Sequence, residues 1–207
     1  MIDHQRRAIF IHIPKTAGVS IYDAFGIRDQ QGHLTIDDYS DHRHEYFSFS
    51  FVRNPWDRAL SIFLYLKKGG RGNPPDLQAQ ATLYDCETFD HFAKNIGEYR
   101  QRLTTVHAPP WGVMLETGES VRRYPHLLPQ TRWTHDIHER QQLDYVGRFE
   151  SLDKDFAVVG RHLGETFVLP HHNATDHGDY RAYYNHRSRG SIARAYESDI
   201  ELLRYRF

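Results

Sequence analysis

The sequence predicts an α/β protein in which helices flank a central, mainly parallel β-sheet. Two observations support this prediction. Residues 9–25 begin as an apolar, β-branched run and continue with apolar residues at helical spacing. Residues 46–66 repeat the same order, with an aromatic-rich alternating run followed by a helical pattern. Two strand-turn-helix units so close together are typical of a parallel sheet whose strands are connected by helices.

The first unit reads "IFIHIPKTAGVSIYDAF". Residues 9–13 have the apolar character of a strand that is buried on both faces, and Pro14 ends it. Residues 19–25 carry an apolar helical face, so the helix begins near Gly18 or Ser20. Between strand and helix we expect a tight turn.

The second unit combines "YFSFSFV", residues 46–52, with "RNPWDRALSIFLYLKK", residues 53–68. The first stretch predicts a strand and the second predicts a polar turn followed by a helix.

No internal repeat or low-complexity segment occurs, so we expect a single domain over 1–207. The other predicted elements are a mobile loop over 67–80, a helix over 86–100, irregular and substrate-facing structure over 104–140, a strand over 145–149, a helix over 152–163 with Ser151 as its cap, and a last helix over 186–203.

Composition excludes several classes of protein. The 207 residues suffice for one full core, and 26 basic against 27 acidic residues give no global field for nucleic acid or a membrane surface. Cys86 is the one cysteine, which excludes an internal disulfide framework and predicts a small buried side chain. No run approaches the ~18 apolar residues of a membrane span. We expect a soluble, cytoplasmic protein, or a soluble domain trimmed from a longer one, and leave the oligomeric state open.

The turn after the first strand has the character of an anion site. The first N–H groups of a helix lack intrahelical partners and attract negative charge, and Lys15 adds a positive charge at the same place. Small residues at 16–18 permit close approach to the main chain, while Thr16 and Ser20 add hydroxyl donors. The pattern indicates a phosphate or sulfate site. The alternative is an ordinary strand-to-helix turn with a surface lysine.

This turn differs from the common nucleoside-triphosphate loop, because the lysine precedes the glycine and no Gly-Lys-Ser or Gly-Lys-Thr occurs in the chain. The second unit supplies Arg53 directly after its strand and Ser61 on the following helix. Ligands bind at the carboxyl ends of strands in open α/β sheets, and a guanidinium can hold a phosphate by two hydrogen bonds. Two such sites suggest a ligand with two separated anionic ends; an ion pair of Arg53 with Asp57 is the alternative.

The segment "IPKTAGVS" resembles the 5′-phosphosulfate segment of sulfotransferases that use 3′-phosphoadenosine 5′-phosphosulfate (PAPS), and "FVRNPWDRALSIF" resembles their 3′-phosphate segment. "QTRWTHD", "YVGRFESLDKDF" and the terminal 28 residues resemble later blocks of the branch that includes carbohydrate 2-O-sulfotransferases and bacterial relatives. The resemblance covers nearly the whole chain in the expected order. It implies a P-loop-like, three-layer α/β fold and a sulfuryl transfer from PAPS to a hydroxyl.

The resemblance also assigns roles to residues. Lys15 would contact the 5′-phosphosulfate near its bridging oxygen, and Arg53 and Ser61 would hold the 3′-phosphate. The residues that would wrap the phosphosulfate are Thr16, Ala17, Gly18, Val19 and Ser20. Sulfuryl transfer depends on positioning and charge stabilisation, as phosphoryl transfer does, so an ammonium at the leaving oxygen favours its departure.

The acceptor hydroxyl needs a general base, and histidine is the residue type best suited to this near neutral pH. His33 in "QGHLTIDDY" resembles the second member of a His-Gly-His pair that precedes the 3′-phosphate block in the 2-O-sulfotransferase branch. Gln31 replaces the first member, so either His33 acts alone or the role has moved. His42 and His44 are the alternatives.

Other groups give weaker signals. His135 and His138, and the histidines at 171, 172 and 177, lack the spacing of known zinc sites, and the proposed transfer needs no metal. Four late arginines, interleaved with tyrosines, either hold an anionic or sugar-like acceptor or form a solvated helix face: Arg181, Arg187, Arg189 and Arg194. Trp111 and Trp133 either stack on a sugar or serve as buried anchors.

Three functional hypotheses follow. The first is a PAPS-dependent sulfotransferase with a carbohydrate or small metabolite as acceptor. The second is a nucleotide or small-molecule kinase of P-loop type, disfavoured by the missing Gly-Lys-Ser/Thr and by the lack of an aspartate placed to hold magnesium. The third is a catalytically silent nucleotide-binding module, which the replacement at Gln31 favours and Lys15 disfavours.

Overall fold

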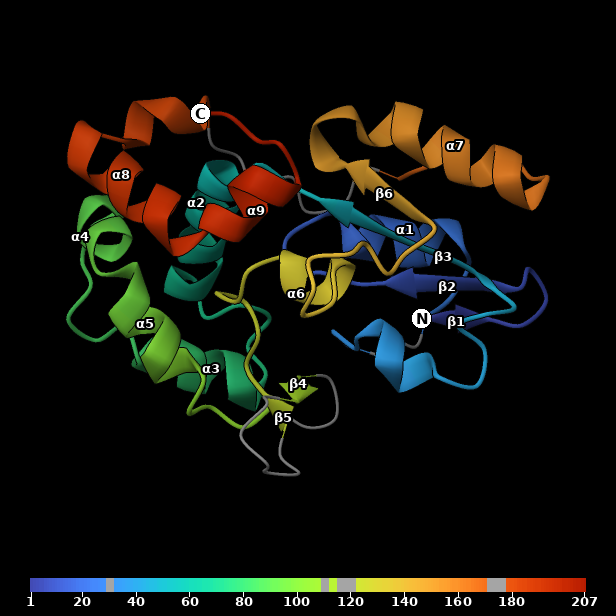
Figure 1. Ribbon diagram of the computed structural model, residues 1–207. Helices are drawn as coiled ribbons and strands as arrows, with labels where there is room; N and C mark the ends of the chain where they lie inside the picture. Colours follow the sequence, from blue (N-terminus) through green and yellow to red (C-terminus); the bar gives the residue numbers. More distant parts are fainter. Residues whose placement is uncertain (29–31, 109–111, 115–121, 171–177) are drawn as a thin grey trace. The chain divides into compact units, whose positions relative to one another are not determined.

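A computed structural model describes residues 1–28, 32–108, 112–114, 122–170 and 178–207 of the chain (Figure 1). The chain forms two compact units, which we describe separately. The first comprises residues 1–53 and 130–174, and the second comprises residues 54–129 and 175–207. The prediction that 1–207 form a single domain stays a prediction.

The first unit contains a four-stranded sheet in the order β1-β2-β3-β6. Its strands are β1 (Ile2–Asp3), β2 (Ala8–Ile11), β3 (Phe47–Val52) and β6 (Tyr145–Arg148). β1 pairs with β2 in antiparallel orientation, while β2, β3 and β6 are parallel to one another. The predicted fold class, an α/β protein with a mainly parallel sheet flanked by helices, is confirmed.

Helices α1 (Gly18–Ala24) and α7 (Leu152–Leu163) pack against one face of this sheet (Figure 1). Phe10, Phe49 and Phe51 contribute the sheet side of this core, and Tyr22 and Phe156 are among the helical residues that cover them. The unit also contains the short helix α6 (Thr131–Thr134) and two 3-10 helices, Ile36–Tyr39 and Phe149–Ser151. Because α1 follows β2 directly, burying its apolar face against the sheet fixes the intervening turn at the carboxyl end of β2.

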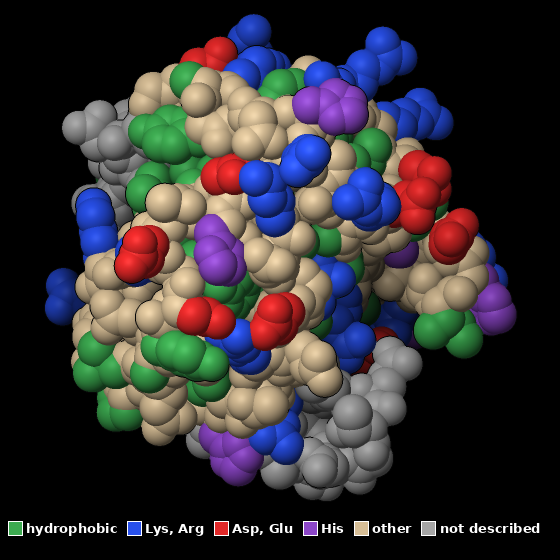
Figure 2. Space-filling view, turned by 90° about the vertical axis from the view of Figure 1, so that its left-hand side faces the viewer, with side chains coloured by type: hydrophobic (Ala, Val, Ile, Leu, Met, Phe, Trp, Pro, Cys, Tyr) green, Lys and Arg blue, Asp and Glu red, His purple; other side chains and the backbone are tan. Residues whose placement is uncertain are grey.

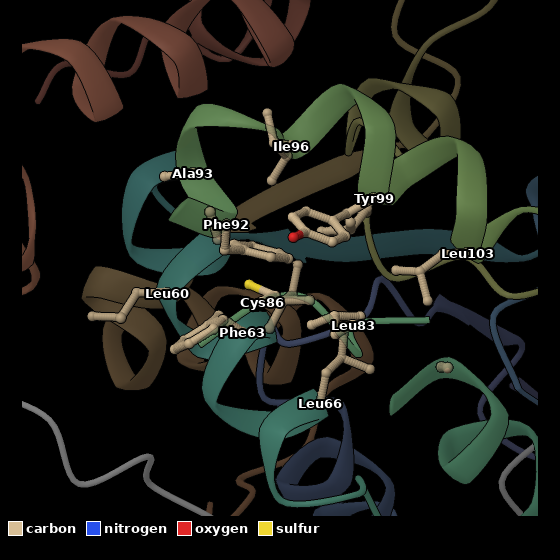
Figure 3. Close-up of a cluster of buried hydrophobic side chains, with 14 of the residues drawn as sticks. Leu60, Phe63, Leu66, Leu83, Cys86, Phe92, Ala93, Ile96, Tyr99 and Leu103 are labelled. Carbon is tan, nitrogen blue, oxygen red and sulfur yellow. The ribbon is translucent and has the colours of Figure 1, made fainter. Parts of the chain in front are cut away.

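The second unit is largely helical. Its elements are α2 (Pro55–Lys67), α3 (Pro74–Ala81), α4 (Phe89–Lys94), α5 (Ile96–Leu103), the hairpin of β4 (Val113–Met114) and β5 (Arg122–Arg123), a 3-10 helix at Tyr180–Tyr183, α8 (His186–Ala195) and α9 (Glu197–Leu202). Figure 3 shows part of its core, where Cys86 lies among Phe63, Phe92, Tyr99 and Leu83. The predicted burial of Cys86 is confirmed, and burial raises the pKa of its thiol.

The predicted loop over 67–80 is wrong in its second half, where α3 forms. Asn73 caps this helix by accepting a hydrogen bond from the main chain of Asp76, and prolines occupy its first positions. The carboxylate of Asp76 is buried and accepts hydrogen bonds from the hydroxyls of Tyr65 and Tyr124 at 2.7 and 2.6 Å. Tertiary contacts therefore hold a segment whose composition indicated only a loop.

Two long predicted helices are each divided. The stretch predicted over 86–100 forms α4 and α5, with Asn95 between them, and the stretch over 186–203 forms α8 and α9, with Tyr196 between them. Both intervening residues have non-helical main-chain angles. Ser151 precedes α7 as predicted, but it does not cap the helix with its side chain; its hydroxyl donates to Asp155 instead.

Charges on the surface are mixed in sign. Figure 2 shows basic and acidic side chains interspersed over one face, in agreement with the nearly balanced composition. The arginines at 181, 187, 189 and 194 are all exposed. Among the helices in the described part of the chain, none combines the length and apolar character that a bilayer crossing requires.

Candidate functional site

The turn between β2 and α1 has a constrained main chain. Lys15 and Ala17 both adopt the left-handed conformation, each with φ of 69°. This conformation costs residues other than glycine roughly 1–2 kcal/mol. Thr16, between them, is completely buried, and its Oγ1 donates a hydrogen bond to the carbonyl of Ile13 at 2.9 Å. The fold therefore holds the predicted anion-binding turn in one strained conformation. The Thr16 hydroxyl, predicted as a donor to the anion, donates its hydrogen within the turn instead.

Gly18, the first residue of α1, allows the turn to pack against His12. A Cβ atom at Gly18 would lie 2.0 Å from Cδ2 and Nε2 of the His12 ring. The His12 ring could not stay where it is beside such an atom, so glycine at this position serves the close approach rather than an unusual φ. The His12 ring also contacts Phe10 and Tyr22, with ring centroids 5.9 and 5.6 Å away.

Arg53 follows β3 and reaches the same turn. Its Nη1 donates to the carbonyl oxygen of Lys15 at 3.4 Å, and its Cζ lies 4.2 Å from the centre of the Phe149 ring. Gln130 fixes its main chain, accepting from the Arg53 N–H and donating to the Arg53 carbonyl, both at 2.8 Å. Arg53 is only 6% exposed. The structure thus brings residues from the ends of two neighbouring parallel strands into contact, as expected for a ligand site of an α/β sheet.

His33 lies beside this turn. Its Nδ1 forms a 2.8 Å hydrogen bond with the carbonyl oxygen of His12, and its ring centroid is 4.4 Å from that of His12. A carbonyl oxygen only accepts, so Nδ1 carries the hydrogen, and the neutral ring then has its lone pair on Nε2. The indole of Trp133 donates to the carbonyl of His33 at 2.9 Å. Both the ring and the main chain of His33 are therefore held.

A model of the sulfotransferase family matches residues 1–206, which is nearly the whole chain. The chain belongs to the sulfotransferase family. No curated protein and no solved structure matches it. Family membership supports a sulfotransferase enzyme in general, and PAPS is the sulfuryl donor that the family implies.

The three predicted bases occupy different places in this sulfotransferase. His33 contacts the turn that contains Lys15, whereas His42 and His44 precede β3 and so lie toward the amino end of that strand, opposite to Arg53 at its carboxyl end. His42 stacks on Tyr46, with ring centroids 4.9 Å apart, and His44 is exposed. Gln31, which replaces the first histidine of the pair, lies outside the described residues.

Ser61, the second residue predicted to hold the 3′-phosphate, belongs to the second unit. It is completely buried on α2, the helix that begins two residues after Arg53. Val19 and Ala17 are half-buried and Ser20 is buried in the first unit. The joint use of Arg53 and Ser61 stays a prediction.

Two residues that support this site, His12 and Gln130, were not predicted from the sequence, and for Trp133 the sequence left two roles open. His12 is a polar residue between Ile11 and Ile13 in an otherwise apolar run, and this interruption is the local feature of the sequence that could have indicated its role. Both Gln130 and Trp133 come from the segment predicted to be irregular. Trp133 lies on α6 and Gln130 directly precedes it, and they form hydrogen bonds with the main chains of His33 and Arg53, respectively. Trp133 is 1% exposed, so it serves as a buried anchor rather than a sugar platform.

Metal ligands do not gather in the described part of the chain, where no group of three or more His, Cys, Asp or Glu side chains comes together. Nδ1 of His135 pairs with the hydroxyl of Thr134 at 2.8 Å. The histidines at 171, 172 and 177, and Trp111, lie outside the described residues.

Proposed function

We propose that this sulfotransferase moves a sulfuryl group from PAPS to a hydroxyl of a carbohydrate or small metabolite. One observation supports the proposal above the others: the buried guanidinium of Arg53 contacts the main chain of Lys15. The guanidinium of Arg53, from the end of one strand, therefore lies at the turn of small residues that contains Lys15, at the end of the neighbouring strand. This combination fits an anionic nucleotide, because charge-assisted hydrogen bonds from a guanidinium suit phosphate and small side chains permit close approach.

PAPS carries its sulfuryl group on a phosphate, and this phosphate is the leaving group, which departs as an anion when the sulfuryl group is transferred. In the proposed site Lys15 provides a positive charge for that developing negative charge. Arg53 binds phosphate, and Phe149 stacks on its guanidinium, which orients the planar fork. Thr16 holds the turn from inside, so the charged groups need little reorganisation when the donor binds.

His33 would act as the general base. The hydrogen bond from its Nδ1 to the His12 carbonyl keeps the lone pair on Nε2, which is the atom that would take the proton of the acceptor hydroxyl. For an imidazole to act as a general base, one ring nitrogen must carry the hydrogen and be held in orientation, and the other must be able to accept a proton. The contacts of His33 with His12 and Trp133 supply this orientation.

A thermal-shift titration with 3′-phosphoadenosine 5′-phosphate (PAP) tests the donor site. Wild type, Arg53→Lys and Arg53→Ala would be compared, with Arg187→Ala as a control at an exposed arginine. Each variant is referred to its own ligand-free midpoint, so a loss of stability does not mimic a loss of binding. A ligand at a hundredfold excess over its Kd adds about 2.7 kcal/mol of stability. We expect stabilisation of wild type and Arg187→Ala, and little in either Arg53 variant.

Two other ligands separate the competing functions. Stabilisation by ATP with magnesium but not by PAP would favour a kinase. Adenosine 5′-phosphosulfate lacks the 3′-phosphate, so it should stabilise wild type less than PAP does. Equal PAP shifts in wild type and Arg53→Ala would remove the main support for the proposal.

The role of His33 is tested by His33→Gln, with His44→Gln as the matched control. PAP release from PAPS is followed across a panel of glycans and small hydroxyl metabolites. General-base catalysis contributes roughly 10²–10⁴-fold, so His33→Gln should lose turnover by that order and keep its PAP shift. If His33→Gln kept full turnover and His44→Gln lost it, His44 rather than His33 would be the general base. PAP binding by wild type without turnover on any acceptor would favour a silent module.

A further inference from the structure

We infer that His12 is a positioning residue for His33. Its imidazole, packed between Gly18 and the His33 ring, holds His33 in the tautomer that has its lone pair on Nε2. The inference rests on the proposed role of His33 as the base. It assigns a function to a histidine that the sequence patterns did not single out.

The main chain of His12 gives the first part of the argument. Its carbonyl oxygen accepts the hydrogen bond from Nδ1 of His33 at 2.8 Å, although the two residues are 21 positions apart. This bond selects one tautomer, because the other would place a lone pair against the carbonyl oxygen. The carbonyl alone does not fix the ring, since the χ2 angle of histidine is broad and roughly two-fold.

The side chain of His12 gives the second part. Its ring contacts the ring of His33 at a centroid distance of 4.4 Å, and Phe10 and Tyr22 contact it as well. On the remaining side lies Gly18, where a Cβ would be 2.0 Å from the ring. The His12 ring therefore has little room to move, and it limits rotation of the ring of His33.

Removal of this ring has a specific consequence. In His12→Ala the carbonyl remains, but the space beside His33 opens and its ring gains freedom to turn over. A turned ring places Cδ2 instead of Nδ1 against the His12 carbonyl, so the hydrogen bond that selects the Nδ1–H tautomer is lost and both tautomers become populated. In His12→Phe a planar ring of similar size remains, so the tautomer should be retained.

The experiment records long-range ¹H–¹⁵N correlations of the histidine rings, which distinguish protonated from unprotonated ring nitrogens. It compares wild type, His12→Ala and His12→Phe. The matched control is His162→Ala, which removes another ring stacked on an aromatic residue of the same unit, with a centroid distance of 3.7 Å to Phe47. We expect Nδ1–H in wild type, His12→Phe and His162→Ala, and a mixture of tautomers in His12→Ala.

Kinetics give a second readout. Misplacement of a catalytic group by about 1 Å costs up to about a hundredfold in rate, so kcat of His12→Ala should fall about tenfold to a hundredfold. The KM for PAPS should stay within about twofold, because the donor-binding residues are unchanged. The acceptor is the panel compound that gives wild type its fastest PAP release. His12→Phe should recover most of the lost kcat.

Gly18→Ala approaches the same ring from its other side and keeps the test valid if His12→Ala fails to fold. Gly97→Ala is its control, since a Cβ there meets no atom within 4 Å. We expect Gly18→Ala to displace the His12 ring and mix the tautomers of His33, and Gly97→Ala to leave them unchanged.

An Nε2–H tautomer in wild type would overturn the inference, as would an unchanged tautomer and kcat in His12→Ala. Equal loss of kcat in His12→Ala and His12→Phe with an unchanged tautomer would also overturn it, because His12 would then act through its nitrogens. Failure of wild type to bind PAP would instead contradict the proposed function. The two failures are therefore distinguishable.

Discussion

Lys15 shows how main chain and side chain of one residue can serve different purposes. Its carbonyl accepts a hydrogen bond from Arg53, and its left-handed φ of 69° belongs to the strained turn that begins α1. Its ammonium is the charge that the proposed reaction requires at the leaving oxygen. A substitution that keeps the aliphatic stem therefore separates the charge from the shape of the turn.

For Lys15→Met we expect kcat with PAPS to fall by on the order of 10²–10³, the typical cost of losing one group that stabilises transition-state charge. The affinity for PAP should fall much less, because Arg53 remains. Turnover and PAP calorimetry measure the two effects, and Lys154→Met, at an exposed lysine of α7, is the control. If PAP affinity and kcat fell by the same factor, Lys15 would be a binding residue without a catalytic role.

At the scale of secondary structure, the short helix α6 is the element that supports the site. Gln130, next to its first residue, is completely buried and makes two hydrogen bonds to the main chain of Arg53. Trp133 reaches the carbonyl of His33 from the same helix. One turn of helix therefore braces both the proposed phosphate-binding residue and the proposed base.

Substitution Gln130→Ala should weaken both folding and PAP binding. It leaves the N–H and the carbonyl of Arg53 without these partners, and each unsatisfied buried group costs roughly 1–3 kcal/mol. Urea unfolding measures stability, and the PAP-dependent shift measures binding. Gln101→Ala, at an exposed glutamine of α5, should change neither. If Gln130→Ala were destabilised but still gained the full wild-type thermal shift from PAP, Gln130 would stabilise the fold without contributing to PAP binding.

At the scale of the whole molecule, ion pairs on both units contribute to the response to acid. Hydrogen bonds from the Arg102 side chain lower the pKa of Asp85 from 3.8 to about 2. A hydrogen bond from the Arg140 main chain is the largest cause that lowers the pKa of Asp136 from 3.8 to about 2. A lowered carboxyl pKa in the folded state stabilises the protein above the unfolded pKa, and this stabilisation is lost as the pH falls.

The thermal midpoint should therefore fall as the pH decreases from about 4 to 2. Over this interval these carboxylates are protonated in the unfolded chain but still ionised in the folded protein. Asp85→Asn should make this decrease shallower, because the amide does not titrate. Asp153→Asn, at an exposed aspartate of α7, serves as the control. Calorimetric scans across this range measure the effect; identical slopes in wild type and Asp85→Asn would show that Asp85 contributes nothing to it.

The local features of this protein were determined by the sequence itself. The strand-turn-helix order around Lys15 and Arg53, the fold class and the burial of Cys86 all follow from patterns within about twenty residues. The sequence also indicated the family, because its motifs keep their order along nearly the whole chain. Periodicity and turn residues act over short stretches of the chain, so their structural consequences can be predicted from the sequence alone.

Only the tertiary structure decided which residues meet. His12 and His33 are 21 positions apart, Arg53 and Gln130 are 77 apart, and His33 and Trp133 are 100 apart. It also decided that 74–81 form a helix, since its buried aspartate is held by hydroxyls from Tyr65 and Tyr124. Hydrogen bonds and ring packing depend on distance in space, and no local pattern encodes a distance between remote parts of the chain.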